Sequence, residues 1–303
     1  MKIIKFFFFL YLILSTDHLF ADNHDFNKWL ISFKTHALNQ GISEITIDTV
    51  MKNVKFLPKV IKYDRYQPEF YEDTKTYINK RTSKKKVEAG VDLYFSNKKL
   101  INIIDKNFKV EKELLLALMG IETNFGLYLG KMNIISSLAT LSYDKRRSDF
   151  FTNELITILK LIDNNFIDYK ILFGSWAGAY GNFQFMPTTM QKYAIDYDRN
   201  NKIDLKSIND SFASAANYIN LMGWKKKQPC FSSIELNKNI PQKFLNTSAK
   251  KLKNKKKLKY FKKYIKNFEE LNINDNLTSA IFTPDKDIVS DSNNLSPAYI
   301  VFD

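Results

Sequence analysis

The sequence predicts a mainly α-helical protein with a small α+β part at its C-terminal end. Apolar residues recur at helical spacing through most of the first two thirds of the 303-residue chain. Strand signals before residue 230 are weak, and the composition changes after Trp224. A chain of this length can form one large domain or two smaller ones.

The apolar pattern predicts helices over residues 25–51, 67–78, 84–95, 100–105, 110–123, 152–163 and 211–222. The segment 110–123 is the best defined, because Leu115, Leu118, Met119 and Glu122 fall on one helical face. Gly126 follows shortly after as a stop signal.

The segment 248–266 is rich in lysine and favours a solvated helix with a thin apolar stripe over a dedicated patch for anionic polymers. Residues 277–303 are polar and interrupted by proline, with a strand expected at 298–302.

The N-terminus reads as a signal peptide, because Lys2 and Lys5 flank the start of an apolar run that is short for a membrane span. Cleavage is expected after Ala21, and no cysteine near it offers a lipoprotein anchor. This divides the chain into a signal peptide at 1–21, a helical domain at 22–228 and a basic, less ordered part at 229–303.

The residue counts limit the chemistry. The only cysteine, Cys230, cannot form an internal disulfide, and three histidines give little support to a histidine-based triad or a zinc site. The net charge of +14 suits nucleic acid, anionic lipid or an acidic polymer, and export argues against nucleic acid.

Two segments carry chemistry. The run from Gly174 to Pro187 is small, aromatic, rich in amides and uncharged, which suits a neutral polymer with hydroxyl and acetamido groups. Glu122 lies on the apolar face and near the negative end of its helix, and both features raise a carboxyl pKa. A carboxyl that stays protonated can donate a proton to a glycosidic oxygen, although most such glutamates are simply solvated.

These segments resemble the membrane-bound lytic murein transglycosylase B family, with gaps, from Gln67 to Trp224. The family motif of a helix ending in Gly-x-Glu-x-x-x-Gly is matched from Gly120 to Gly126. The resemblance implies a lysozyme-like enzyme, a carbon–oxygen lyase in which Glu122 is the single acid/base. It also implies cleavage of peptidoglycan with a 1,6-anhydro product, and no required cofactor.

The resemblance also implies a set of substrate-binding residues: Tyr77, Arg146, Arg147, Ser175, Gln184, Phe185, Met186 and Tyr218. The arginines are expected to bind lactyl or peptide carboxylates. Phe183 stands where the family usually has a small residue, and Phe150 where some members have a cleft tyrosine. Core packing is the alternative for Phe185 and Met186, and surface charge for the arginines.

The segment 196–210 resembles an EF-hand loop, with Asp196, Asp198, Asn200, Lys202 and Asp210 as the residues that would hold a structural Ca²⁺. Asn201 replaces the usual glycine, and Ser207 stands at the twelfth position, so Asp210 is expected to close the site. A solvated Asx-rich turn is the alternative.

Family members continue beyond a segment like Ser296–Phe302, and the resemblance therefore predicts that a cleft-forming C-terminal segment is missing. A peptidoglycan-binding protein with weak catalysis is the alternative that this favours, and a cationic surface or nucleic-acid binder is a third. We expect a periplasmic monomer of the Gram-negative envelope. Its partners would be glycan strands, with loose association with the membrane or other wall proteins and no nucleic acid.

Overall fold

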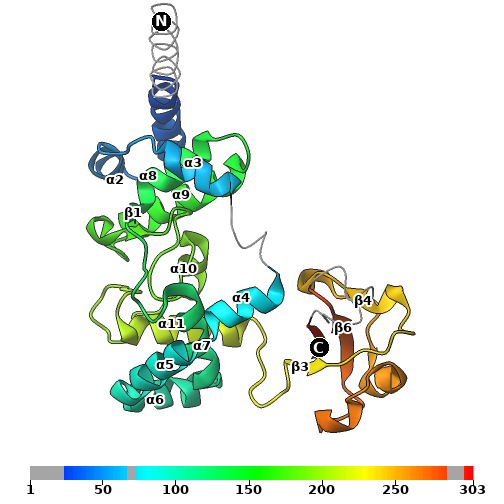
Figure 1. Cartoon of the computed structure of the whole chain (residues 1–303). Coiled ribbons are helices and arrows are strands. Elements are labelled where there is room, and N and C mark those ends of the chain that lie inside the picture. The colour runs from blue at the N-terminus through cyan, green and yellow to red at the C-terminus, as the bar shows by residue number, and fades with distance from the viewer. Residues whose placement is uncertain (1–23, 67–72, 285–296, 303) are drawn as a thin grey trace, which may run out of the picture. The chain divides into compact units, whose positions relative to one another are not determined.

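The computed structural model describes residues 24–66, 73–284 and 297–302 (Figure 1). The chain forms two compact units, Met1–Gln67 with Glu88–Trp224 and Pro68–Val87 with Lys225–Asp303. The expected signal peptide lies outside the described residues, and within them no helix is both long and apolar enough to cross a membrane.

The first unit is helical apart from two short strands. After a helix that ends at residue 39, its elements are α2 (Glu44–Met51), α3 (Pro58–Arg65), α5 (Lys84–Ser96, whose first residues belong to the second unit), α6 (Lys98–Phe108), α7 (Lys112–Thr123), β1 (Met132–Asn133), α8 (Ile134–Tyr143), α9 (Ser148–Asp163), η2 (Tyr169–Ile171), β2 (Phe173–Gly174), α10 (Pro187–Tyr193) and α11 (Ile208–Leu221).

Most of the helices expected in the first unit are confirmed, and one is corrected. The expected helix over 67–78 lies partly outside the described residues, and the helix described there covers Thr74–Arg81. The segment 25–51 is two helices, because Gly41 adopts a φ of 84° and Ser43 then caps α2 by accepting a hydrogen bond from Thr46 N. Helix α8 had no expected counterpart, because nine of its residues, from Ile134 to Ser142, are buried and leave no amphipathic pattern to detect.

The core of the first unit is built where α8 packs against α9. Glu154 of α9 is only 2% exposed, and its carboxylate accepts hydrogen bonds from the backbone N and Oγ1 of Thr188 at 2.9 and 2.7 Å. This buried carboxylate therefore holds the first turn of α10, directly after Phe185 and Met186.

The second unit contains α4 (Thr74–Arg81) and a five-stranded sheet ordered β3-β7-β6-β4, with β5 also paired to β6. Its elements after α4 are β3 (Phe231–Ile234), η3 (Gln242–Phe244), β4 (Leu245–Asn246), η4 (Ala249–Lys251), β5 (Lys256–Lys257), η5 (Leu258–Tyr264), η6 (Phe268–Leu271), β6 (Thr278–Phe282) and β7 (Ala298–Phe302). Strands β4 and β6 are parallel, and the other pairs are antiparallel.

The expected strand at 298–302 is confirmed as β7, which lies between β3 and β6. The expected α-helix over 248–266 is wrong. This segment forms 3-10 turns and the strand β5, and Leu258, Phe261 and Ile265 are buried in the core of the second unit. The lysines between them are exposed. The buried apolar residues therefore belong to successive turns and do not form one stripe along an α-helix.

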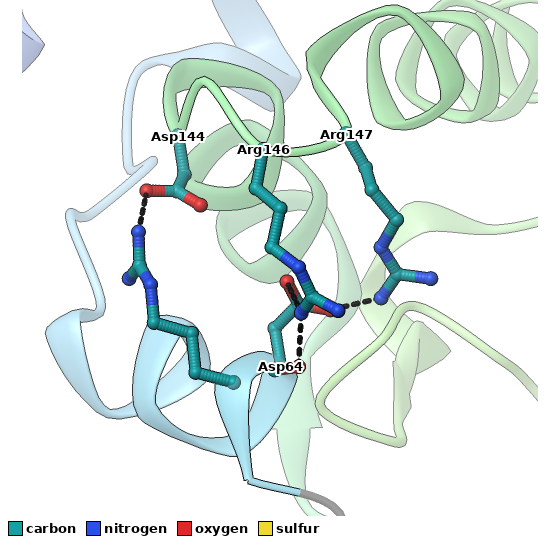
Figure 2. A network of polar contacts seen from close by, with 5 residues as sticks. Asp64, Asp144, Arg146 and Arg147 are labelled. Atoms are coloured by element: carbon teal, nitrogen blue, oxygen red, sulfur yellow. Dashed lines mark hydrogen bonds and ion pairs between the residues drawn. The ribbon is translucent and has the colours of Figure 1, made fainter.

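Two consecutive residues of α3 bind the turn between α8 and α9 (Figure 2). The side chain of Asp64 is 1% exposed, and its carboxylate lies between the guanidinium groups of Arg146, at 2.7 Å, and Arg147. Arg65 donates to Asp144 at 2.8 Å in a more exposed pair. Because a buried carboxylate is stable only when it is paired, Asp64 requires the two arginines to stay folded over it.

We expect Asp64→Asn to lower the free energy of unfolding by about 1–3 kcal/mol, because a charge-assisted hydrogen-bond network in a buried place is lost. The matched control is Asp144→Asn, which removes the exposed pair between the same two elements and should cost about 0–1 kcal/mol. Urea denaturation of both variants checks this. If both variants lose the same free energy of unfolding, the burial of Asp64 does not add to stability.

Candidate active site

Glu122 occupies the last turn of α7 and is solvent-accessible. Surrounding protein nevertheless raises the pKa of its carboxyl, because partial desolvation disfavours the charged form. Glu122 makes no hydrogen bond or ion pair with any residue that the structure describes. A carboxyl that is accessible, lacks a partner and holds its proton more strongly than usual is able to donate that proton to a ligand.

The end of α7 is fixed by a sharp reversal of the chain. Asn124, Phe125 and Gly126 all have positive φ, at 50°, 58° and 84°, and turn the chain back over the helix. The ring of Phe125 lies so close to Gly120 that a Cβ there would be 2.7 Å from its Cζ atom. Glycine at position 120 therefore permits the reversal that presents Glu122 at the helix end.

Thr123 and Asn182 join this helix end to the uncharged run. Both side chains are buried, and Thr123 Oγ1 donates to the carbonyl oxygen of Asn182 at 2.9 Å. The same hydroxyl accepts from Gly126 N at 3.1 Å. Asn182 in turn donates from its backbone N to Leu205 O and from Nδ2 to Lys206 O and Ser211 Oγ. The residue beside Glu122 is therefore bound to a residue that is itself fixed on several sides.

Ser175 lies near the start of the uncharged run from Gly174 to Pro187, and Gln184 lies near its end. Ser175 Oγ accepts a hydrogen bond from Ala179 N at 3.0 Å, which closes a tight turn. Gln184 has a φ of 50°, and its Nε2 donates to Gly181 O at 2.9 Å. Both side chains are half-buried, so each keeps some access to solvent.

Beneath this turn lies Tyr180, which is fully buried and donates to Asp204 Oδ1 at 3.0 Å. Burial, with the nearby Asp204 charge, raises the pKa of Tyr180, so the hydroxyl remains a donor. Lys206 lies over the Tyr180 ring and donates to Ile171 O, and burial lowers its pKa. These contacts attach the uncharged run to the segment 196–210.

The aromatic candidates are mainly packed. Phe185 is 6% exposed, and its ring meets that of Tyr218 at 5.7 Å between centroids. Phe183 points into the core against Phe212, at 5.3 Å. Met186 is half-buried and directly precedes α10. Groove-wall roles for Phe185, Met186 and Tyr218 stay predictions.

The remaining candidates are divided between the units. Arg146 and Arg147 hold Asp64, yet their side chains are 47% and 39% exposed, so part of each guanidinium still faces solvent. The ring of Tyr63, next to Asp64, lies beside the ring of Trp176, with 6.5 Å between the centroids. Helix α3 therefore reaches the turn that carries Ser175. Tyr77 belongs to the second unit, where its ring stacks on the Arg81 guanidinium.

The structure brings together Asp196, Asp198 and Asp210, with one carboxylate oxygen of each within 4.8 Å of the others. Ser207 caps α11, because its Oγ accepts a hydrogen bond from Asp210 N at 3.1 Å. Asp196 Oδ1 and Asp198 Oδ1 both accept from Asn200 N, and Asn200 Oδ1 accepts from Lys202 N. Ca²⁺ prefers oxygen ligands such as carboxylates, so the three converging carboxylates fit that ion.

Sequence reasoning missed Asn182 and Asp64. Asn182 binds Thr123, which is next to Glu122, and Asp64 binds Arg146 and Arg147. Asn182 sits inside the run already singled out, but its buried amide bonds to residues more than twenty positions away. Asp64 looks like any polar residue of a lysine-rich helix. Neither position carries a local pattern that indicates its tertiary contacts.

The model of the transglycosylase SLT domain family matches residues 25–293. The chain is 34% identical over 151 residues to membrane-bound lytic murein transglycosylase B of Escherichia coli (strain K12), which covers 50% of this chain and 42% of that protein. The chain thus spans less than half the length of this curated relative.

Two solved structures share the fold. SltB3 from Pseudomonas aeruginosa, in complex with NAG-NAM-pentapeptide, superposes with a TM-score of 0.77 at 28% identity, over 92% of this chain and 72% of that one. Lytic transglycosylase Slt35 of Escherichia coli, in complex with calcium, superposes with a TM-score of 0.72 at 23% identity, over 90% of this chain and 83% of that one. The expected fold, mainly α and lysozyme-like with a small sheet part, is confirmed. The chain belongs to the transglycosylase SLT domain family.

Proposed function

We propose that this protein is a lytic transglycosylase that cleaves the β-1,4 bond between N-acetylmuramic acid and N-acetylglucosamine in peptidoglycan. The observation that carries the proposal is Glu122, an accessible carboxyl with a raised pKa at a helix end that is bound to an uncharged polar turn. The glycan fragment bound by SltB3 supports the choice of substrate.

In the first step Glu122 donates its proton to the glycosidic oxygen, and the bond from that oxygen to C1 of the muramic residue breaks. The raised pKa keeps the carboxyl protonated to a higher pH than usual. The positive charge that develops at C1 is stabilised by the acetamido group of the substrate itself, so no second protein carboxylate is required.

In the second step the Glu122 carboxylate takes the proton from the C6 hydroxyl of the same sugar, and that oxygen forms a bond to C1. The product is a 1,6-anhydro ring. Glu122 is protonated again, and no water is consumed. Ser175 and Gln184 would bind the acetamido and hydroxyl groups, and the outward parts of Arg146 and Arg147 would bind lactyl or peptide carboxylates.

We further propose that the cluster of Asp196, Asp198 and Asp210 holds a structural Ca²⁺. Asn200 and the backbone carbonyl of Lys202 would complete the ligands, as in an EF-hand loop. The ion would neutralise carboxylates that lie within 4.8 Å of one another. It would stabilise a loop that bonds to Tyr180 and Asn182, and it would take no part in the proton transfers.

The basic, apolar start of the sequence supports export to the periplasm of a Gram-negative cell, where peptidoglycan lies. We propose a monomer there whose main partner is the glycan strand.

The first test is digestion of purified sacculi, with Glu122→Gln as the variant. We expect the parent to release anhydromuropeptides, seen by mass analysis, and the variant to lose about 10²–10⁴-fold in rate, because glutamine cannot exchange the proton. Activity of the parent should fall as the pH rises through the raised pKa of Glu122. Products with reducing muramic ends would mean hydrolysis. Binding without any product would favour a peptidoglycan-binding protein.

The second test asks whether the Thr123–Asn182 contact positions Glu122. Thr123→Val should lower kcat by about tenfold, equivalent to about 1.4 kcal/mol in barrier height, with little change in KM. Thr157→Val is the matched control. Thr123 and Thr157 are both buried helical threonines, and each donates to the carbonyl oxygen four residues earlier, that of Met119 and Asn153 respectively. Thr157 has no contact with Asn182. Equal kinetics for the two variants would remove the positioning role.

The third test is thermal unfolding with and without calcium. Ca²⁺ at about 100 times its Kd should stabilise the fold by about 2.7 kcal/mol and raise Tm, and Asp196→Ala should abolish the shift. Asp168→Ala, which removes an aspartate that caps η2 outside the cluster, should keep the shift. If millimolar calcium leaves Tm unchanged, the loop is an Asx-rich turn.

A further inference from the structure

We propose that a concavity in the first unit binds one N-acetylhexosamine ring of the glycan strand beyond Ser175. This would lengthen the proposed substrate-binding surface. The concavity has a volume of about 230 Å³. It is lined by α2 and the residues after it, by β1 and the start of α8, and by η2 and β2. The inference rests on the proposed function, because it assumes a glycan polymer at Ser175.

The lining of this concavity suits a neutral sugar. Val50 and Ile135 are buried and form an apolar floor. Thr49, Asn53 and Tyr169 add two hydroxyls and an amide, and none of these side chains makes a hydrogen bond within the described ranges. A sugar ring presents an apolar C–H face and a rim of hydroxyl and acetamido groups, which these residues would match.

The charge of the lining argues against other small ligands. Lys170 is the only charged residue among the lining side chains, and no carboxylate lines the concavity. A metal cation would therefore find no anionic ligand. A single exposed ammonium is also a weak basis for a phosphate site, which ordinarily gathers several donors. An acidic strand that carries lactyl or peptide carboxylates would meet attraction rather than repulsion.

The register of β2 places this concavity beside the proposed active site. Phe173 lies in β2 and Ser175 follows it two positions later, so their Cα atoms lie at most about 7 Å apart. Gly174 between them faces inward, where a Cβ would lie 2.1 Å from Ala179 O. Phe173 pairs with Asn133 across the two-stranded sheet and is 44% exposed. A polymer that contacts Ser175 can therefore place its next ring on Phe173.

The test measures glycan binding by calorimetry in the Glu122→Gln chain, which cannot turn the strand over. The probes are peptide-free glycan in two forms, a single disaccharide unit and long strands. Phe173→Ala and Asn53→Ala remove parts of the lining, and Thr49→Trp fills the concavity without removing a buried group. Phe166→Ala is the matched control, because Phe166 is 53% exposed and lies outside the lining.

We expect each lining variant to raise the Kd for long strands by about tenfold, or about 1.4 kcal/mol, and to leave the Kd for the disaccharide unchanged. The control should change neither value. If the Glu122→Gln chain binds long strands and the lining variants bind them equally well, this inference fails while the proposed function stands. If that chain binds neither form of glycan, the proposed function fails as well.

Discussion

The contact between Thr123 and Asn182 is the constraint on which the candidate site depends. Asn182 is 2% exposed, and its backbone and side chain together bond to Thr123, Leu205, Lys206 and Ser211. Its backbone N–H, its carbonyl oxygen and its Nδ2 group are all engaged, so a displacement would leave buried polar groups without partners. The end of α7, the uncharged turn and the segment 196–210 therefore share one fixed point. Proton transfer to a bound sugar requires this kind of stable placement, since small errors in position are costly.

Three buried carboxylates of the first unit support the fold, and Glu122 lies in a different environment. Asp64, Glu154 and Asp210 are buried, and each accepts hydrogen bonds from guanidinium, hydroxyl or backbone donors. Such groups are committed to their partners and cannot exchange protons without destabilising the fold. Glu122 differs in both respects, because it is accessible and has no hydrogen-bond partner within the described part of the chain. The proposed role of Glu122 as the acid rests on this environment and on the raised pKa of its carboxyl, rather than on residue type.

The sequence predicted the helices that have a clear apolar stripe, such as α7 and α9, and the strand β7. It could not predict α8, whose residues are buried on all sides, or the 3-10 turns of 258–264, where lysines mask the buried Leu258 and Phe261. Ser175 and Gln184 could be singled out from the sequence, because they lie in the uncharged run that resembles the family. Asn182 lies in the same run. The support from Asp64 was not, because its partners lie about eighty residues away in the chain.

In the proposed function, short-range specificity and long-range attraction would come from different parts of the molecule. The turn around Ser175 is uncharged, so it can distinguish sugar groups only by hydrogen bonds and shape at short range. The net charge of +14 acts over longer distances, and many of the lysines that contribute to it lie on the surface of the second unit. Such a charge raises the local concentration of an acidic polymer, but salt screens it within about 8 Å at physiological ionic strength. If the protein binds glycan as proposed, the fixed polar groups beside Glu122 would decide recognition, and the basic surface would affect only the rate of association.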